Sequence, residues 1–291
     1  MRHARDRALR RFAANRGALV GAALVALVVA IAVLAPVIGG RDPVAADIDH
    51  GLTTMGAPLP PHGGEWLGTD QLGRSVWSRI AHGAGISLLV ALASTAIALT
   101  VGLVVGLIAG YAGGTTDAAL MRMVDLFLAF PFLLLAILLA ALLRQAGIAS
   151  GTAPVFITLG AVSWTTMARV IRGKVLSLRE RDFVQAARAM GASTARILAR
   201  HLLPNVGGVV IVLATLGFAQ MILAESVLSY LGLGPPPPTP TWGRMLYEGR
   251  SYYQTAPWLI AVPGVAILIT VVAFNLLGEG LRDAFDPKDR R

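Results

Sequence analysis

The chain has 291 residues, of which 55% are hydrophobic and 14% charged, with a formal net charge of +9 and no cysteine. A soluble domain carries about 25% charged residues, so the composition argues against a soluble globular protein, and the lack of cysteine excludes disulfides, thiolate metal sites and a cysteine nucleophile. The basic residues flank long apolar blocks, which favours a polytopic membrane protein over one that binds nucleic acid.

The N-terminal region predicts a first transmembrane helix. Residues 1–17 contain six arginines, and an apolar stretch follows over about 18–38. A signal peptide has an apolar region of roughly 7–15 residues, whereas about 21 residues make a helix of about 32 Å, enough to cross a bilayer. We therefore expect an uncleaved span, followed by a polar extracytoplasmic segment over residues 39–84 that is too short to be a large domain.

Two further spans follow. The second, about 86–111, has small residues at every fourth position, which permits close helix packing and favours packing over ligand binding: Ser94, Ala98, Gly102, Gly106 and Gly110. The third, about 120–143, contains Pro131, whose freed carbonyl a neighbouring helix can satisfy. Near its start, Arg122 and Asp125 have the spacing of a structural ion pair.

The last three spans are predicted at about 153–171, 206–228 and 257–278. Trp164, in the fourth, and Gln220, in the fifth, are polar candidates for the transport pathway or a gate. Glu225 is a third candidate, because a carboxylate within an apolar helix is a functional candidate by default. Its place near the far end of the fifth span also fits a structural role, reaching water or capping a neighbour. Trp242, Tyr252 and Tyr253 suggest an interface belt.

The distribution of basic residues predicts the orientation. With the N-terminus inside, the cytoplasmic segments 1–17, 112–122, 169–205 and 279–291 carry 19 of the 25 Lys and Arg residues, and the outside segments carry 6. This bias favours cytoplasmic termini. It also places the basic segment between the fourth and fifth spans in the cytoplasm.

That segment, DFVQAARAMGASTARILARHLLPN over residues 182–205, predicts a helical hairpin. A capping box over residues 177–180 predicts a helix from about residue 178, with Phe183, Ala187 and Met190 on one face. Gly191 is expected to end this helix because glycine adopts the left-handed region without penalty. An ordinary cytoplasmic loop and a docking surface remain equally open on spacing alone.

The second helix of the hairpin is expected over about 194–202. Ser193 can cap its first turn, and Pro204 is expected to stop it.

The same segment resembles the EAA loop of ABC import permeases, with Gln185 in place of the usual glutamate. In that family the loop lies in a groove of a cytoplasmic ATPase subunit and transmits its motion to the membrane helices. The resemblance implies that residues 178–204 form the coupling loop. Its docking face would be formed by Gln185, Ala186, Ala187, Gly191 and Ile197. His201 and Pro204 would fix the chain where it returns into the fifth span.

A second resemblance narrows the family. The run from Trp66 to Arg74, WLGTDQLGR, by itself fits an interfacial segment with a tryptophan anchor. It resembles the LGTDxLGRD element of C-type permeases for dipeptides and oligopeptides, with Ser75 where the second acid is usual. The stretch from Glu225 to Leu281 resembles the same family.

The resemblance implies an all-α polytopic membrane protein with six transmembrane helices and the type I ABC importer permease fold. It divides the chain into residues 1–84, the permease domain 85–282 and a cytoplasmic tail 283–291. The implied partners are a homologous second permease, ABC ATPase subunits, an extracytoplasmic peptide-binding protein and membrane lipid, with no nucleic acid. Localisation would be the inner membrane, and the mechanism alternating access.

The sequence contains no catalytic motif. No GxxxxGK[ST] loop occurs, since neither Lys174 nor Lys288 follows one, and the histidines lack metal-ligand spacing. We therefore expect no enzymatic activity and no cofactor in this chain, with ATP and Mg²⁺ used by partner ATPase subunits. The leading hypothesis is a peptide permease. The alternatives are a nickel or other small-solute permease of the same family, a stand-alone channel or membrane enzyme, and a structural scaffold.

Overall fold

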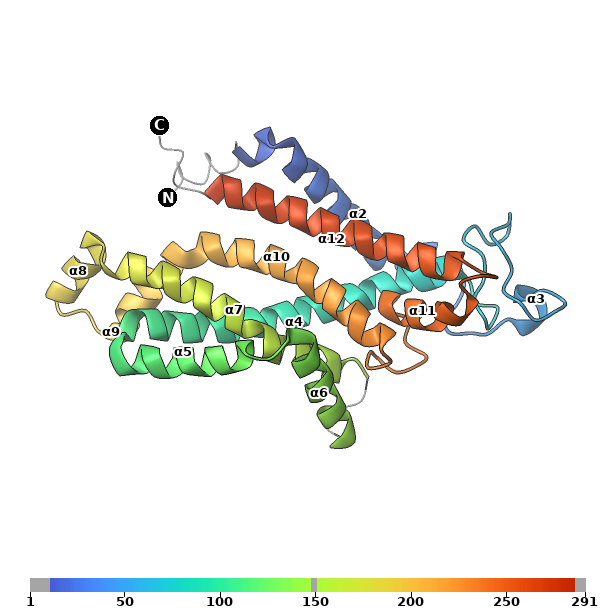
Figure 1. Ribbon diagram of the computed structural model, residues 1–291. Coiled ribbons are helices and arrows are strands. Elements are labelled where there is room, and N and C mark those ends of the chain that lie inside the picture. The colour runs from blue at the N-terminus through green and yellow to red at the C-terminus, as the bar shows by residue number, and fades with distance from the viewer. Residues whose placement is uncertain (1–10, 148–150, 286–291) are drawn as a thin grey trace.

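The computed structural model describes residues 11–147 and 151–285, and this part of the chain is built from helices (Figure 1). The predictions for the charged N-terminal arm and for the end of the tail fall partly outside these residues. Five helices in the described part are long and apolar enough to cross a membrane: α2 (Arg16–Ile38), α4 (Val76–Ala112), α7 (Ala153–Arg179), a continuous helix over Thr194–Tyr230, and α12 (Trp258–Phe285). The all-α membrane fold expected from the sequence is confirmed.

The third expected span is a broken one. It consists of α5 (Gly114–Leu128) and α6 (Phe132–Gln145), which meet at an angle of 88°. The break lies at Pro131, which lacks the N–H needed to continue a helix and clashes with the preceding turn. The expected pairing of Arg122 with Asp125 is wrong, because Asp125 accepts a hydrogen bond from Arg169 of α7 at 2.5 Å.

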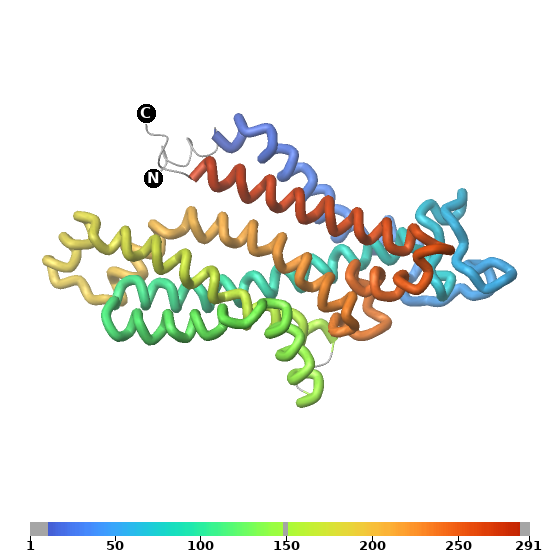
Figure 2. Tube along the Cα trace, in the orientation of Figure 1, coloured from blue at the N-terminus to red at the C-terminus, as the bar shows by residue number. Residues whose placement is uncertain are grey.

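The bundle is organised around α4 and α7, which pack along most of their length. Gly102, Gly106 and Gly110 of α4 all face α7, and a Cβ atom at Gly106 would lie 2.7 Å from the carbonyl oxygen of Ala168. The helix α10 (Leu203–Tyr230) packs against both α4 and α12, while α2 lies beside α12 on the outside of the bundle (Figure 2).

The two ends of the bundle differ in structure. One end carries α8 (Asp182–Ala189) and α9 (Thr194–Arg196), and α2 begins and α12 ends there (Figure 1). The opposite end carries the segment 39–75 with α3 (Ile48–Gly51), together with α11 (Trp242–Gly249) and the short 3-10 helix η2 (Arg250–Tyr252). The charge bias of the sequence predicts that the first end is the cytoplasmic one.

The expected interface belt is partly wrong. Trp242 is buried rather than interfacial, because its ring nitrogen donates to the carbonyl of Ile80 at 3.1 Å and its backbone N–H to Ser87 at 3.2 Å. Tyr253 is exposed. The expected division at residue 84 stays a prediction, and α4 runs continuously through that residue.

Candidate functional site

The segment between α7 and α10 folds as a helical hairpin, which we call the loop hairpin (residues 178–204). Its first helix, α8, ends at Ala189, and Gly191 has a φ of 75°. The N–H of Gly191 donates to Arg188 at 2.9 Å and that of Ala192 to Ala187 at 3.0 Å. These two bonds satisfy the last carbonyls of the helix and need a left-handed residue between them. The prediction that Gly191 ends this helix is confirmed.

The predicted start of that helix near residue 178 is wrong. Ser177 and Leu178 belong to α7, which continues to Arg179 because Leu178 packs against the same buried cluster as Ile171 of α7. The chain then turns, and α8 begins at Asp182. Gln185 fastens this turn, since its side-chain amide donates to the carbonyl of Arg179 at 3.2 Å.

The second helix begins as expected but does not stop at Pro204. The hydroxyl of Ser193 accepts the N–H of Arg196 at 3.4 Å and caps α9. The chain then widens into the π-helix η1 (Ile197–Leu202) and continues directly into α10. A wider turn before Pro204 avoids the clash that its ring would cause in a regular helix. The second arm of the loop hairpin and the fifth span therefore form one continuous helix over Thr194–Tyr230.

The hairpin encloses a small core of its own. Val184, Ala187, Ile197 and Leu202 are buried against Ile171, Val175 and Val206 from α7 and α10. Ala187 and Ile197, expected on the docking face, are only 2% and 1% exposed. They hold the two arms of the hairpin together and do not present a surface to a partner. The expected face of Phe183, Ala187 and Met190 is likewise wrong, because Val184 takes the buried position.

The exposed surface of the hairpin contains Gln185, Ala186 and Gly191 of the expected docking set. His201 is half-buried, with its ring 6.4 Å from that of Phe183. Met190 is 82% exposed beside Gly191, at the turn between the two arms. Its exposure was not predicted, although its place directly before a helix-ending glycine was a usable signal.

An open cavity lies where the broken span meets α7 and α10, and we call it the apolar cavity. Its volume is about 560 Å³. Phe127, Phe130 and Phe132 reach it from the α5–α6 break, and Ser163 and Gln220 are among its few polar lining residues. None of its lining residues is charged.

Of the three pathway candidates, only Gln220 lines this cavity. Trp164 is buried behind it and packs edge-on against Phe127, with ring centroids 5.6 Å apart. Glu225 is fully buried in the protein core, where its carboxylate accepts the hydroxyl of Ser229 at 2.7 Å. Glu225 therefore does not reach water, and the structure does not bring the three candidates together.

A second cavity, the basic cavity, opens at the end of the bundle that carries the loop hairpin and has a volume of about 1130 Å³. Residues of α7, α8, α10 and α12 line it. Its charged lining residues are Lys174, Arg181, Asp182 and Arg282. Leu213 and Leu216 of α10 line both cavities. The apolar and basic cavities therefore adjoin along one face of α10.

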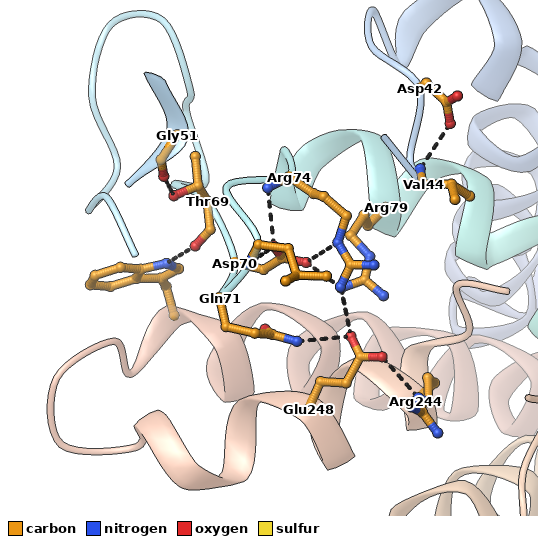
Figure 3. Close-up of polar contacts among 12 residues, drawn as sticks. Asp42, Val44, Gly51, Thr69, Asp70, Gln71, Arg74, Arg79, Arg244 and Glu248 are labelled. Carbon is orange, nitrogen blue, oxygen red and sulfur yellow. Dashed lines mark hydrogen bonds and ion pairs between the residues drawn. The ribbon is translucent and has the colours of Figure 1, made fainter. Parts of the chain in front are cut away.

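The opposite end of the molecule holds a buried network of charges (Figure 3). Asp70 accepts hydrogen bonds from Arg74, at 2.7 Å, and from Arg79. Glu248 of α11 accepts from Arg79 at 2.8 Å and from Arg244 at 2.8 Å. The network holds α11 and the segment that precedes α4 against the first turn of α4. The LGTDQLGR element contributes Asp70 and Arg74 to the network. Sequence analysis missed Glu248, although it is the only acidic residue between positions 229 and 256.

Burial and charge act in opposite directions on Glu248. Removal from water by itself raises the pKa of its carboxyl group, but the attraction of Arg79 and the hydrogen bonds from Arg244 and Arg79 together outweigh it. The pKa of Glu248 is therefore lower than usual, and the carboxylate is ionised at neutral pH.

Comparison with family models gives two matches. Residues 102–291 match the family described as binding-protein-dependent transport system inner membrane component. Residues 5–61 match the N-terminal TM domain of oligopeptide transport permease C. The first match covers the loop hairpin, α10 and both cavities.

Comparison with individual proteins agrees. The oligopeptide transport system permease protein OppC of Escherichia coli K12 is 40% identical over 283 residues, covering 97% of this chain and 91% of the relative. The di/tripeptide transport system permease protein DppC of Pseudomonas aeruginosa is 42% identical over 280 residues, covering 95% and 90%. The inward-facing MetNI methionine ABC transporter is similar in fold, with a TM-score of 0.60 and 19% identity over 72% of this chain and 98% of that chain.

Proposed function

The chain belongs to the family of binding-protein-dependent transport system inner membrane components, and from this premise we propose that it forms half of the translocation path of an ATP-driven peptide importer. Relatives that carry oligopeptide or dipeptide permease names support peptides as the substrate over nickel or another small solute. They also support a transport subunit over a stand-alone channel, a membrane enzyme or a scaffold.

One observation carries the proposed mechanism: the loop hairpin is continuous with two helices that line both cavities. The helix α7 enters the hairpin directly, and α10 leaves it through η1 without a break. A displacement of the hairpin is therefore transmitted along two rigid helices to the walls of the path. We propose that a cytoplasmic ATPase subunit grips the exposed surface around Gln185, Ala186, Met190 and Gly191, and that ATP binding drives alternating access.

The remaining partners follow from this mechanism. A homologous second permease would complete the path opposite the apolar cavity, and an extracytoplasmic binding protein would deliver peptide. ATP and Mg²⁺ would be used by the ATPase subunits, and this chain would hold no cofactor. Both termini would lie in the cytoplasm.

Uptake by the reconstituted assembly tests the proposal. The chain, with its second permease, ATPase subunits and binding protein, is expected to import labelled peptide into proteoliposomes when ATP is supplied to the ATPase side. Replacement of Gly191 by Trp is expected to abolish both uptake and ATPase stimulation, with insertion unchanged, because a bulky side chain on a strained left-handed residue disrupts the gripped surface.

A matched control is available at Gly114→Trp. Gly114 also has a positive φ, of 53°, and open surroundings, but it is the first residue of α5, outside the hairpin. Uptake is expected to persist in this variant. If Gly191→Trp retains uptake and ATPase stimulation, the coupling role of the hairpin is wrong.

A further inference from the structure

The electrostatic character of the path changes abruptly between its two cavities. The apolar cavity has no charged lining residue, whereas the adjoining basic cavity has three cations and one carboxylate. A peptide that moves from the first cavity into the second therefore meets its first charged side chains in this chain at the cytoplasmic end. This step of the argument rests on the function proposed above.

Within the described residues, the three cations differ from three arginines of α7 in having no ion-pair partner. Arg169, Arg172 and Arg179 of α7 are paired with Asp125, Asp117 and Glu180. Among the residues that the structure describes, no ion pair or hydrogen bond is formed by the side chains of Lys174, Arg181 or Arg282. Arg169, Arg172 and Arg179 are absent from the lining of the basic cavity, whereas Lys174, Arg181 and Arg282 line it.

The positive-inside rule alone does not account for this arrangement. It explains why basic residues concentrate on the cytoplasmic side, but it makes no prediction about which cavity or surface their side chains face. Here the unpaired cations come from three elements, α7, the start of the loop hairpin and α12, and they converge on one cavity. Asp182 offsets only one of the three charges.

Carboxylates are the groups that such a cavity favours. A peptide carboxylate is poorly solvated in the uncharged cavity, and a cleft lined by one sign of charge concentrates the opposite sign. We propose that Lys174, Arg181 and Arg282 form an inner cation cluster that receives the carboxylates of a peptide as it leaves the apolar cavity. The cluster lowers the barrier for acidic peptides relative to basic ones.

The test compares two tripeptides, Ala-Glu-Ala and Ala-Lys-Ala, in the complete reconstituted assembly with its binding protein. The measured quantity is the ratio of their uptake rates, and each variant's ratio is divided by that of the wild type. Selection by the binding protein is common to all preparations and cancels. Lys174→Gln with Arg282→Gln is the principal variant because neither residue lies in the loop hairpin.

We expect this double variant to shift the ratio about three- to tenfold toward Ala-Lys-Ala, the range that one or two partly screened ion pairs provide. ATPase stimulation should be unchanged. The control is Arg122→Gln, which removes an exposed arginine of α5 that lines neither cavity, and its ratio should equal that of the wild type. Charge reversal, Lys174→Glu with Arg282→Glu, should shift the ratio further.

An unchanged ratio in the double variants overturns the proposal, as does an equal loss of both peptides. If that equal loss accompanies the disappearance of acidic phospholipid from the purified assembly, the cations hold a lipid headgroup instead. Failure of the proposed function is distinguishable, because the wild-type assembly would then import neither tripeptide.

Discussion

At the scale of single residues, Glu248 is the carboxylate on which the buried charge network depends most. It pairs with Arg74, Arg79 and Arg244. Within the described residues, Asp70 is the one other carboxylate that pairs with any of these three arginines. Removal of one partner from a buried ion pair leaves uncompensated charge, which costs more than the pair contributes.

We therefore expect Glu248→Gln to lower the free energy of unfolding by about 3–5 kcal/mol at neutral pH. The pKa of Glu248 is lower in the folded protein than its ordinary value of 4.5. Its contribution is thus fully present above pH 4.5 and is lost as pH falls through the folded-state pKa. The difference between wild type and variant should shrink below pH 4.5, as measured by denaturant unfolding in detergent from pH 7 to pH 3.

Glu180→Gln provides the control, because that carboxylate is exposed and pairs only with its neighbour Arg179. Its effect should be within about 0.5 kcal/mol at every pH. If wild type and Glu248→Gln differed in free energy of unfolding by the same amount at every pH, the Glu248 carboxylate would not carry the charge assigned to it.

At the scale of elements, the contact between α4 and α7 is the most extensive helix packing in the described part of the chain. Each glycine of the stripe faces backbone or Cβ atoms of α7, so the two helices approach at a distance that only glycine permits. The small residues at every fourth position predicted this packing, because residues four positions apart lie on one face of a helix. The partner helix was not predicted, since spacing within one helix says nothing of its neighbour.

Gly106→Ala is expected to destabilise the protein by about 1–3 kcal/mol through overpacking. The new methyl group would lie 2.7 Å from the Ala168 carbonyl oxygen and 2.8 Å from the Ile171 Cβ atom. Unfolding in detergent, titrated with sodium dodecyl sulfate and followed by circular dichroism, measures the change.

Gly173→Ala is the matched control on the partner helix. Nothing lies within 4 Å of its added Cβ atom, and alanine is the better helix former by about 0.5–1 kcal/mol. The control should be neutral or stabilising. Equal stability of Gly106→Ala and the wild type would show that the helices separate without cost.

Other elements departed from expectation because their neighbours decided them. Composition alone predicted a continuous third span. In the structure the span is bent by 88° at Pro131, and three phenylalanines near the bend line the apolar cavity. Pro204 was expected to end a helix, yet the preceding π-helix lets the chain continue. In both cases proline marked the site of an irregularity, while the surrounding packing chose between a bend and a widened turn.

At the scale of the whole molecule, the two ends of the bundle should lie on opposite sides of the membrane. The protein contains no cysteine, so single cysteines can report this without a background. Met55→Cys, at a position 94% exposed, should react with a membrane-impermeant thiol reagent in intact spheroplasts. Ala195→Cys, exposed on the loop hairpin, should react only after permeabilisation.

The cysteine-free wild type supplies the blank for both measurements. Labelling of Ala195→Cys in sealed cells would place the loop hairpin outside and remove it from reach of any cytoplasmic ATPase. The coupling mechanism would then be wrong.

The sequence by itself determined the membrane class, the spans, the expected orientation and the hairpin turn at Gly191. These depend on properties that act locally along the chain: apolar length, the position of basic residues and the conformational freedom of glycine. Only the tertiary structure decided which residues of the hairpin face outward, and that Glu248 completes a network with Asp70 and Arg79. It alone brought Lys174, Arg181 and Arg282 to one cavity, because contacts between residues far apart in the chain arise from packing and carry no local signature.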